Sequence, residues 1–190
     1  MRSIQYAYNE SKQQVGEIYG ERISVHEFQN LVDEYAEVVK FTSGNSALND
    51  QQLIQLRDQV WNTYVNNKLI EHEAEELGLT GTDAEIQSVI AEGNWPILMQ
   101  TPSRNEQTGR FDANVLKKFL TDYEGMKTKS EQMPAEYMDY YNSLYKFWMF
   151  IEKTLRQESL AQKYQVLLSK AMLGNKIIDK AAFEARTNES

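Results

Sequence analysis

The chain has 190 residues, a formal net charge of −8 and a hydrophobic fraction of 41%, which is enough apolar material for one large or two small folded domains. Because its charges are spread along the chain, the sequence lacks the clustered lysines and arginines of a sequence-independent nucleic-acid-binding protein. It has no cysteine, hence no disulfide framework or thiolate site, and no run of about eighteen apolar residues that would predict a membrane-spanning helix.

The N-terminal segment predicts an arm, a hairpin and a helix. Residues 1–14 carry little pattern and are expected to form a flexible arm. The stretch VGEIYGERIS has two short alternating runs around Gly20-Glu21, which predicts a small β-hairpin. A helix is expected to begin after Ser24, because Ser24 and Glu27 match a capping box. Its expected buried face consists of Phe28, Leu31, Val32, Tyr35, Val38 and Val39.

A longer helix is predicted over residues 50–77. Asn49 and Gln52 match a second capping box, and Gly78 is expected to end the helix in a left-handed conformation. Apolar residues at helical spacing predict one broad buried stripe: Leu53, Leu56, Val60, Trp61, Tyr64, Val65, Leu69, Ile70 and Ala74. The short loop before this helix predicts that it lies beside the preceding one.

The middle of the chain predicts two shorter helices and a loop. Thr82 and Glu85 match a third capping box, which predicts a helix over 83–92. Residues 93–110 lose the periodicity and hold two of the three prolines, so they predict a long surface loop. Asp112 is expected to cap the helix that follows.

The last long helix is predicted over residues 134–172 and is expected to end at Gly174. Its apolar seam is Tyr137, Tyr141, Leu144, Trp148, Ile151 and Leu155, resumed by Tyr164, Leu167, Leu168 and Met172. We expect this seam to pack against the helix 50–77. Because the segment LYKFWMFI is apolar on most of its circumference, it is either buried on several sides or presents aromatic surface to another molecule.

No motif predicts catalysis, a metal or a cofactor. His26 and His72 stand apart, whereas a zinc site needs three or four ligands at compatible spacing. The sequence has no phosphate-binding glycine loop and no nucleophile elbow. The dense carboxylates Glu71, Glu73, Glu75 and Glu76 are typical of a solvated helix face.

The aromatic and methionine residues are the remaining candidates for a binding site. Side chains that lie off the seam of the last helix are expected to form a shallow apolar groove, covered by residues of the loop 93–110. The expected client-binding residues are Tyr140, Phe147, Met149, Phe150, Trp95, Ile97 and Met99. Flexible methionines and amphipathic tyrosines suit a surface that accepts many apolar sequences, so charge should matter little.

Three segments, taken together, resemble the N-terminal chaperone region of the SurA/PpiD-type periplasmic foldases. VGEIYGERISVHEF resembles the family's opening strand, glycine turn and first helix. LRDQVWNTYVNNKLIEHEAEELGLT resembles its next helix with the Gly-Leu ending, and TGRFDANVLKKFL resembles the Gly-x-Phe-Asp turn after its variable loop. The resemblance implies a mostly α fold with long helices and a short N-terminal β-hairpin.

The resemblance also implies a function and a setting. It implies a periplasmic chaperone module over residues 15–174 that binds unfolded or partly folded envelope and outer-membrane proteins. Residues 175–190 are then expected to be a linker toward a parvulin-type peptidyl-prolyl cis-trans isomerase domain absent from this chain, and any membrane anchor is expected to be absent as well. The alternative is a helical assembly domain whose aromatic flank mainly mediates homodimerisation.

Overall fold

A computed structural model of the protein describes residues 14–45, 47–128 and 133–188, with side chains described as far as residue 172. Its elements are β1 (Gln14–Ile18), β2 (Glu21–Ser24), α2 (Val25–Ser43), α3 (Asp50–Glu76), α4 (Asp83–Glu92), the 3-10 helix η1 (Pro96–Gln100), α5 (Ala113–Lys127) and α6 (Ala135–Asn188). The predicted mostly α fold with a short N-terminal hairpin is confirmed. The expected arm lies outside the described residues, except that Gln14 begins β1.

The hairpin turns one residue earlier than predicted. Tyr19 and Gly20 are its central residues, with φ of 49° and 81°, and Glu21 pairs with Ile18. Positive φ at both central residues matches the twist of a two-residue hairpin. The prediction of a Gly20-Glu21 turn is therefore wrong. Tyr19 adopts a left-handed conformation, which a tyrosine in the sequence does not predict.

The predicted helix starts are confirmed by their hydrogen bonds. The Ser24 hydroxyl accepts from the Glu27 amide at 3.1 Å, and the Asn49 side chain accepts from the Gln52 amide at 2.9 Å. Thr82 forms the third capping box, and Asp112 caps α5. These signals are local, because each cap satisfies amides within its own first turn.

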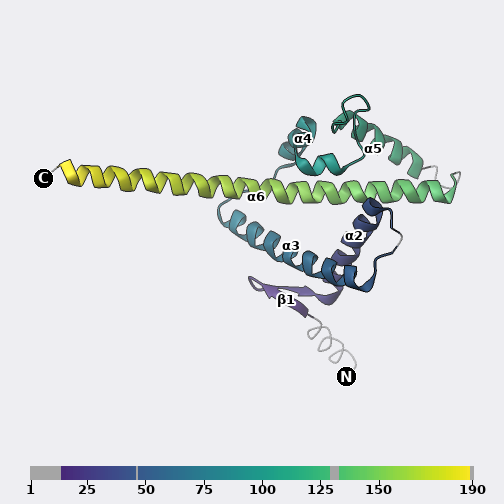
Figure 1. Ribbon diagram of the computed structural model, residues 1–190, viewed down its shortest axis with the longest axis horizontal. Coiled ribbons are helices and arrows are strands. Elements are labelled where there is room, and N and C mark those ends of the chain that lie inside the picture. The colour runs from purple at the N-terminus through teal and green to yellow at the C-terminus, as the bar shows by residue number, and fades with distance from the viewer. Residues whose placement is uncertain (1–13, 46, 129–132, 189–190) are drawn as a thin grey trace, which may run out of the picture.

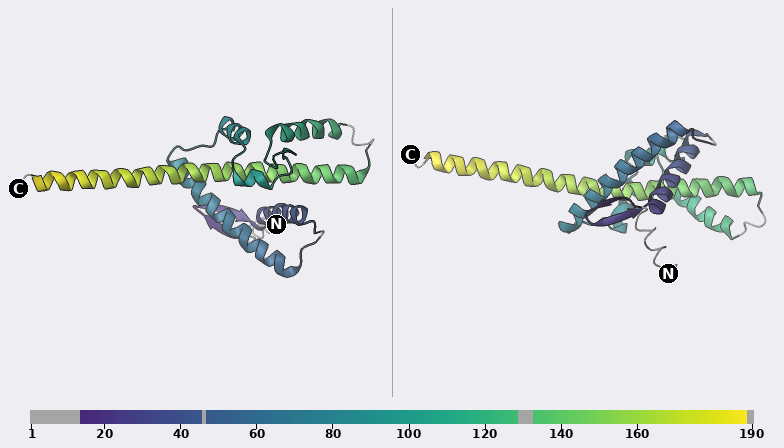
Figure 2. Two further views of the ribbon diagram at one scale, coloured as in Figure 1. Left: turned by 45° about the horizontal axis from the view of Figure 1, so that its top comes forward. Right: turned by 90° about the horizontal axis from the view of Figure 1, so that it is seen from below.

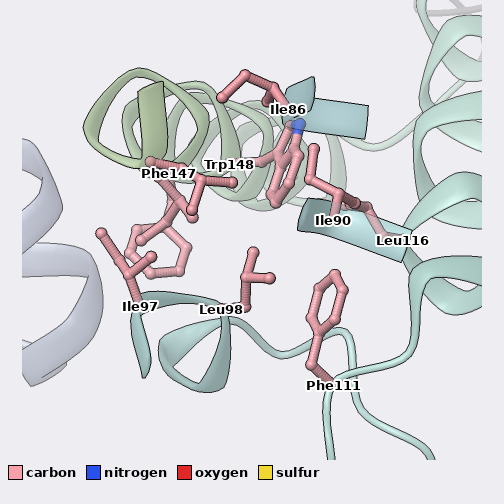
Figure 3. Packing of buried hydrophobic residues seen from close by; sticks show 10 residues of the cluster. Ile86, Ile90, Ile97, Leu98, Phe111, Leu116, Phe147 and Trp148 are labelled. Atoms are coloured by element: carbon pink, nitrogen blue, oxygen red, sulfur yellow. The ribbon is translucent and has the colours of Figure 1, made fainter. Parts of the chain in front are cut away.

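α6 lies between two groups of elements (Figure 1). One group is β1, β2, α2 and α3, and the other is α4, η1 and α5; the views in Figure 2 show the same separation. The first group holds the α2–α3 cluster of buried residues Ile23, Phe28, Val32, Ala36, Leu56 and Val60. The second group and α6 form the α4–α5 cluster of Ile86, Ile90, Ile97, Leu98, Phe111, Leu116, Phe147, Trp148, Ile151 and Leu155 (Figure 3).

The predicted contact between α6 and α3 is present, but the seam of α6 has further partners that were not predicted. Trp148, Ile151 and Leu155 are buried as expected, in a cluster that they share with α4, η1 and α5. α3 runs obliquely to α6, so α6 covers only part of the α3 stripe (Figure 1). Leu53 and Leu69 of that stripe are consequently exposed, and so is Tyr137 of the predicted seam.

α6 is one helix of 54 residues, roughly 80 Å long at 1.5 Å per residue. The prediction that it ends at Gly174 is wrong, because the helix continues to Asn188. A glycine inside a helix costs only about 1 kcal/mol relative to alanine, so neighbouring helix-forming residues can carry the helix through it.

The C-terminal part of α6 extends beyond the other elements (Figure 1). The seam residues predicted to resume there, Leu167, Leu168 and Met172, are exposed, with Met172 at 69%. No helix in the described part of the chain is long and apolar enough to cross a membrane.

Candidate functional site

The crossing of α2 and α6 separates two hollows on the surface. Tyr35 of α2 meets Phe150 of α6 edge to face, with ring centroids 4.8 Å apart. Beside this pair, Lys153 Nζ lies 2.8 Å from Glu34 Oε2. The aromatic pair and the ion pair therefore fix the two helices at the point between the hollows.

The first hollow, which we call the three-helix cavity, lies between α2, α3, α6 and the end of β2. Its volume is ≈ 340 Å³, at the lower end of the range for ligand sites in proteins. Its apolar and aromatic lining consists of Ile23, Leu31, Tyr35, Tyr64 and Phe150. All of these except Ile23 are half-buried, so the cavity is open to solvent.

Polar side chains form another wall of this cavity. Thr63 and Asn67 project from α3, and Gln157 projects from α6. All three are half-buried, and within the described residues none of their side chains makes a hydrogen bond. The cavity therefore combines an apolar surface with amide and hydroxyl groups that remain available to a ligand.

The tyrosines of the cavity keep their protons. Burial raises the pKa of Tyr35, and the Glu34 carboxylate raises it further. Burial also raises the pKa of Tyr64, although the Lys68 ammonium acts in the opposite direction. Both phenols are therefore neutral at physiological pH and can donate a hydrogen bond.

The second hollow, which we call the α2–α6 groove, has a volume of ≈ 400 Å³. Its apolar part consists of Val38, Phe41, Phe147 and Met149, and its polar part includes Asp33, Glu34, Glu37 and Lys146. Phe41 and Phe147 lie with ring centroids 5.3 Å apart. Glu34 pairs with Lys153 and Glu37 pairs with Lys40, whereas Asp33 accepts a hydrogen bond from the Gln29 side chain.

Two of the seven expected client-binding residues are buried instead of exposed. Phe147 is 3% exposed and Ile97 is 7% exposed, and both belong to the α4–α5 cluster, where Ile97 lies near the Phe147 ring (Figure 3). The expectation that these side chains lie free on the surface is wrong. α6 is covered from two sides, so a side chain off its main seam is still buried.

The other five expected residues lie in separate places. Phe150 lines the three-helix cavity, and Met149, 45% exposed, lines the α2–α6 groove. Tyr140 is 55% exposed and contacts Tyr141, while Met99 is also exposed. Trp95 lines a third hollow with residues of α6 that include Glu158 and Gln162. The structure therefore does not assemble the seven residues into one groove.

The loop 93–110 does not cover either hollow beside α2. Its residues form η1, and Ile97, Leu98 and Thr101 are buried within the α4–α5 side of the molecule. Arg104 and Phe111 form an isolated antiparallel bridge that closes the loop. The prediction of a surface loop is therefore correct only in part: Ile97, Leu98, Thr101 and Ser103 are buried, whereas residues 104 and 106–110 are exposed.

Sequence reasoning missed the polar wall of the three-helix cavity, although a signal for it exists. Asn67 and Glu71 follow Val60 by seven and eleven residues, so they share its helix face. Polar residues on a face that is otherwise buried indicate a hollow or a polar contact. The predicted buried stripe included Leu69 and Ile70 but not these polar residues.

In the described part of the chain, no three His, Cys, Asp or Glu side chains lie close enough together to bind a metal ion. The His72 ring contacts the Tyr19 ring at a tilt of 42°, with centroids 3.9 Å apart, and His72 Nε2 lies 3.7 Å from Glu76 Oε1.

Comparison with protein-family models matches the SurA-like N-terminal domain over residues 1–120. Searches of curated proteins and of solved structures find no match. The matched range contains the hairpin, α2, α3, α4, η1 and the first part of α5, and α6 follows it.

Proposed function

The chain belongs to the family of SurA-like N-terminal domains, which are chaperone-type modules, and from this membership we propose that it holds unfolded or partly folded segments of envelope proteins. The three-helix cavity is the observation that carries the proposal. It is open, and it offers both apolar surface and unpaired polar groups. A segment of unfolded chain presents both kinds of group at once.

The setting is part of the same proposal. The resemblance to the SurA/PpiD-type foldases supports a periplasmic protein in which this module accompanies a parvulin-type peptidyl-prolyl isomerase domain. The clients would then be nascent outer-membrane and other envelope proteins, with neither nucleic acid nor a cofactor involved.

Affinity for a single client segment should be modest. Burial of apolar area contributes about 25 cal/mol per Å², but ordering a flexible client consumes much of that gain. A hollow of ≈ 340 Å³ accommodates only a few residues. Dissociation constants on the order of micromolar are therefore expected.

Surface substitutions in each hollow test the proposal. Phe150→Ser removes an apolar wall of the three-helix cavity, and Met149→Ser does so in the α2–α6 groove. Both variants should suppress aggregation of a urea-unfolded outer-membrane protein less well than the parent. Ile54→Ser is the matched control, because Ile54 is 62% exposed on α3 and lines neither hollow. Thermal melting establishes that each variant is folded; unchanged suppression by folded Phe150→Ser and Met149→Ser would refute these sites.

A second candidate function rests on the C-terminal part of α6. Val166, Leu167, Leu168 and Met172 are exposed on a helix that extends beyond the other elements (Figure 1). Such a surface is compatible with homodimerisation as the main role. Sedimentation velocity at several concentrations distinguishes the two: a tight dimer that fails to suppress aggregation would favour the assembly domain.

A further inference from the structure

The polar wall of the three-helix cavity has the chemistry of a main-chain recognition site. Asn67 and Gln157 each carry a carbonyl acceptor and an amide donor, which is the complement of a peptide C=O and N–H. Within the described residues these side chains have no hydrogen-bond partner, although each is half-buried. Half-buried polar groups that face a hollow must be satisfied by water or by a ligand.

The spacing of the polar groups on α3 fits an extended peptide. Thr63, Asn67 and Glu71 line the cavity at intervals of four residues, which is a rise of about 6 Å per step. In an extended chain, equivalent main-chain groups on one side recur every two residues, about 6.6 Å apart. A strand lying along α3 would therefore meet a polar side chain at each repeat.

The apolar part of the cavity suits the alternate side chains of the same peptide. Leu31 and Tyr35 of α2 and Phe150 of α6 supply apolar surface in the same cavity as the polar row of α3. The volume of ≈ 340 Å³ has room for a short segment of extended chain. The charged lining residues are two acids, Glu27 and Glu71, and two bases, Lys68 and Lys153, which gives no preference for either sign of charge.

We propose that the three-helix cavity binds a short extended segment of unfolded polypeptide through its main chain, with Asn67 and Gln157 as the principal partners and Thr63 as a third. This inference rests on the proposed function and specifies what is recognised. Because every peptide carries the same main chain, such a site accepts many sequences and requires only that the segment be extended and unpaired. One apolar side chain per segment adds affinity without fixing the sequence.

The experiment measures binding of a fluorescein-labelled ten-residue peptide that alternates leucine and serine, by fluorescence anisotropy. A second peptide has the same sequence with alternate backbone nitrogens methylated, so it keeps the side chains but loses main-chain donors. The proteins are the parent chain, Asn67→Ala, Gln157→Ala and the double variant. Asn66→Ala is the matched control, because Asn66 is exposed beside Asn67 and does not line the cavity.

The inference predicts that each cavity variant weakens binding of the unmethylated peptide about fivefold, since one net hydrogen bond contributes roughly 1 kcal/mol. Methylation should weaken binding to the parent chain and to Asn66→Ala, but have little further effect on the double variant. Equal effects of methylation on the parent and the double variant would overturn the inference while leaving the proposed function intact. If neither peptide binds the parent chain, the proposed function fails as well. Thermal melting of each variant establishes that lost binding is not lost folding.

Discussion

Gly16 lies in close contact with Trp61 of α3. A Cβ placed on Gly16 would lie 2.6 Å from Cη2 of Trp61, closer than real contacts allow. The Trp61 ring also packs edge to face on Phe28 of the α2–α3 cluster, so it is not free to withdraw. Gly16 therefore serves close packing rather than an unusual backbone conformation.

We expect Gly16→Ala to lower the free energy of unfolding by about 1–3 kcal/mol, as overpacking does. In a Trp61→Leu background the clash is removed, and the same substitution should have little effect. Urea denaturation of the four members of this cycle measures the coupling. Gly81→Ala is the control, because a Cβ there meets nothing within 4 Å; a similar loss in that variant would contradict the explanation.

Residue-scale features were predictable where their cause is local. Ser24, Asn49 and Thr82 cap helices through amides three residues away, so the sequence contains the whole interaction. Burial on α6 was less predictable: Trp148 is core as expected, but Phe147 is buried because two groups of elements enclose α6. That enclosure depends on contacts far apart in the chain.

At the scale of elements, ion pairs link α4 to α6. Lys163 Nζ lies 2.6 Å from Glu85 Oε2 and donates to the Thr80 carbonyl at 2.7 Å. The hydrogen bond from Lys163, with further ones from the Thr82 amide and hydroxyl, lowers the pKa of Glu85 from 4.5 to about 2. Arg156 makes a second link to α4 through Asp83.

The lowered pKa of Glu85 predicts a loss of stability in acid. The carboxylate stays ionised in the folded state down to about pH 2 but is protonated near pH 4.5 in the unfolded state. Its contribution is therefore complete above about pH 4.5 and lost as the pH falls toward 2. Melting temperatures of Glu85→Gln should fall less steeply across this range than those of the parent. Glu75→Gln, an exposed carboxylate of α3, should follow the parent; identical profiles for all three would argue against the assignment.

The helical conformation of Gly174 can be tested by whether Gly174→Ala stabilises or destabilises the helix. Inside a helix, Gly174→Ala should raise helix stability by up to about 1 kcal/mol. At a left-handed helix end, which the sequence pattern favoured, the same change would be destabilising. Far-UV circular dichroism during thermal melting distinguishes the outcomes, and reduced helicity in Gly174→Ala would contradict the continuous helix.

Elements were predictable individually but not in their pairing. The starts of α2, α3, α4 and α5 follow from caps and periodicity. The full set of partners of α6 does not follow, because an apolar stripe does not specify every surface that it contacts. α3 contacts α6 as predicted, but α4, η1 and α5 also pack on its seam. The three-helix cavity was hidden for the same reason, since it exists only where three elements fail to close on one another.

At the scale of the whole molecule, the two clusters differ in their need for α6. The α2–α3 cluster contains no buried residue of α6, whereas four of the ten buried residues in the α4–α5 cluster come from it. We expect a chain ending at residue 133 to lose the fold of α4, η1 and α5. Hydrogen exchange should then find the amides of residues 83–127 unprotected, and persistent protection there would show that these elements fold without α6.

α6 follows α4, η1 and α5 in the chain, and this order has a consequence for synthesis. The buried residues of the α4–α5 cluster that precede α6 end at Leu116, but the last buried residue of that cluster, Leu155, follows 39 residues later. At about 5–20 residues per second, translation of that interval takes roughly 2–8 s. For those seconds the nascent protein exposes an apolar face of its own, and the time at which it is covered is set by the ribosome rather than by diffusion.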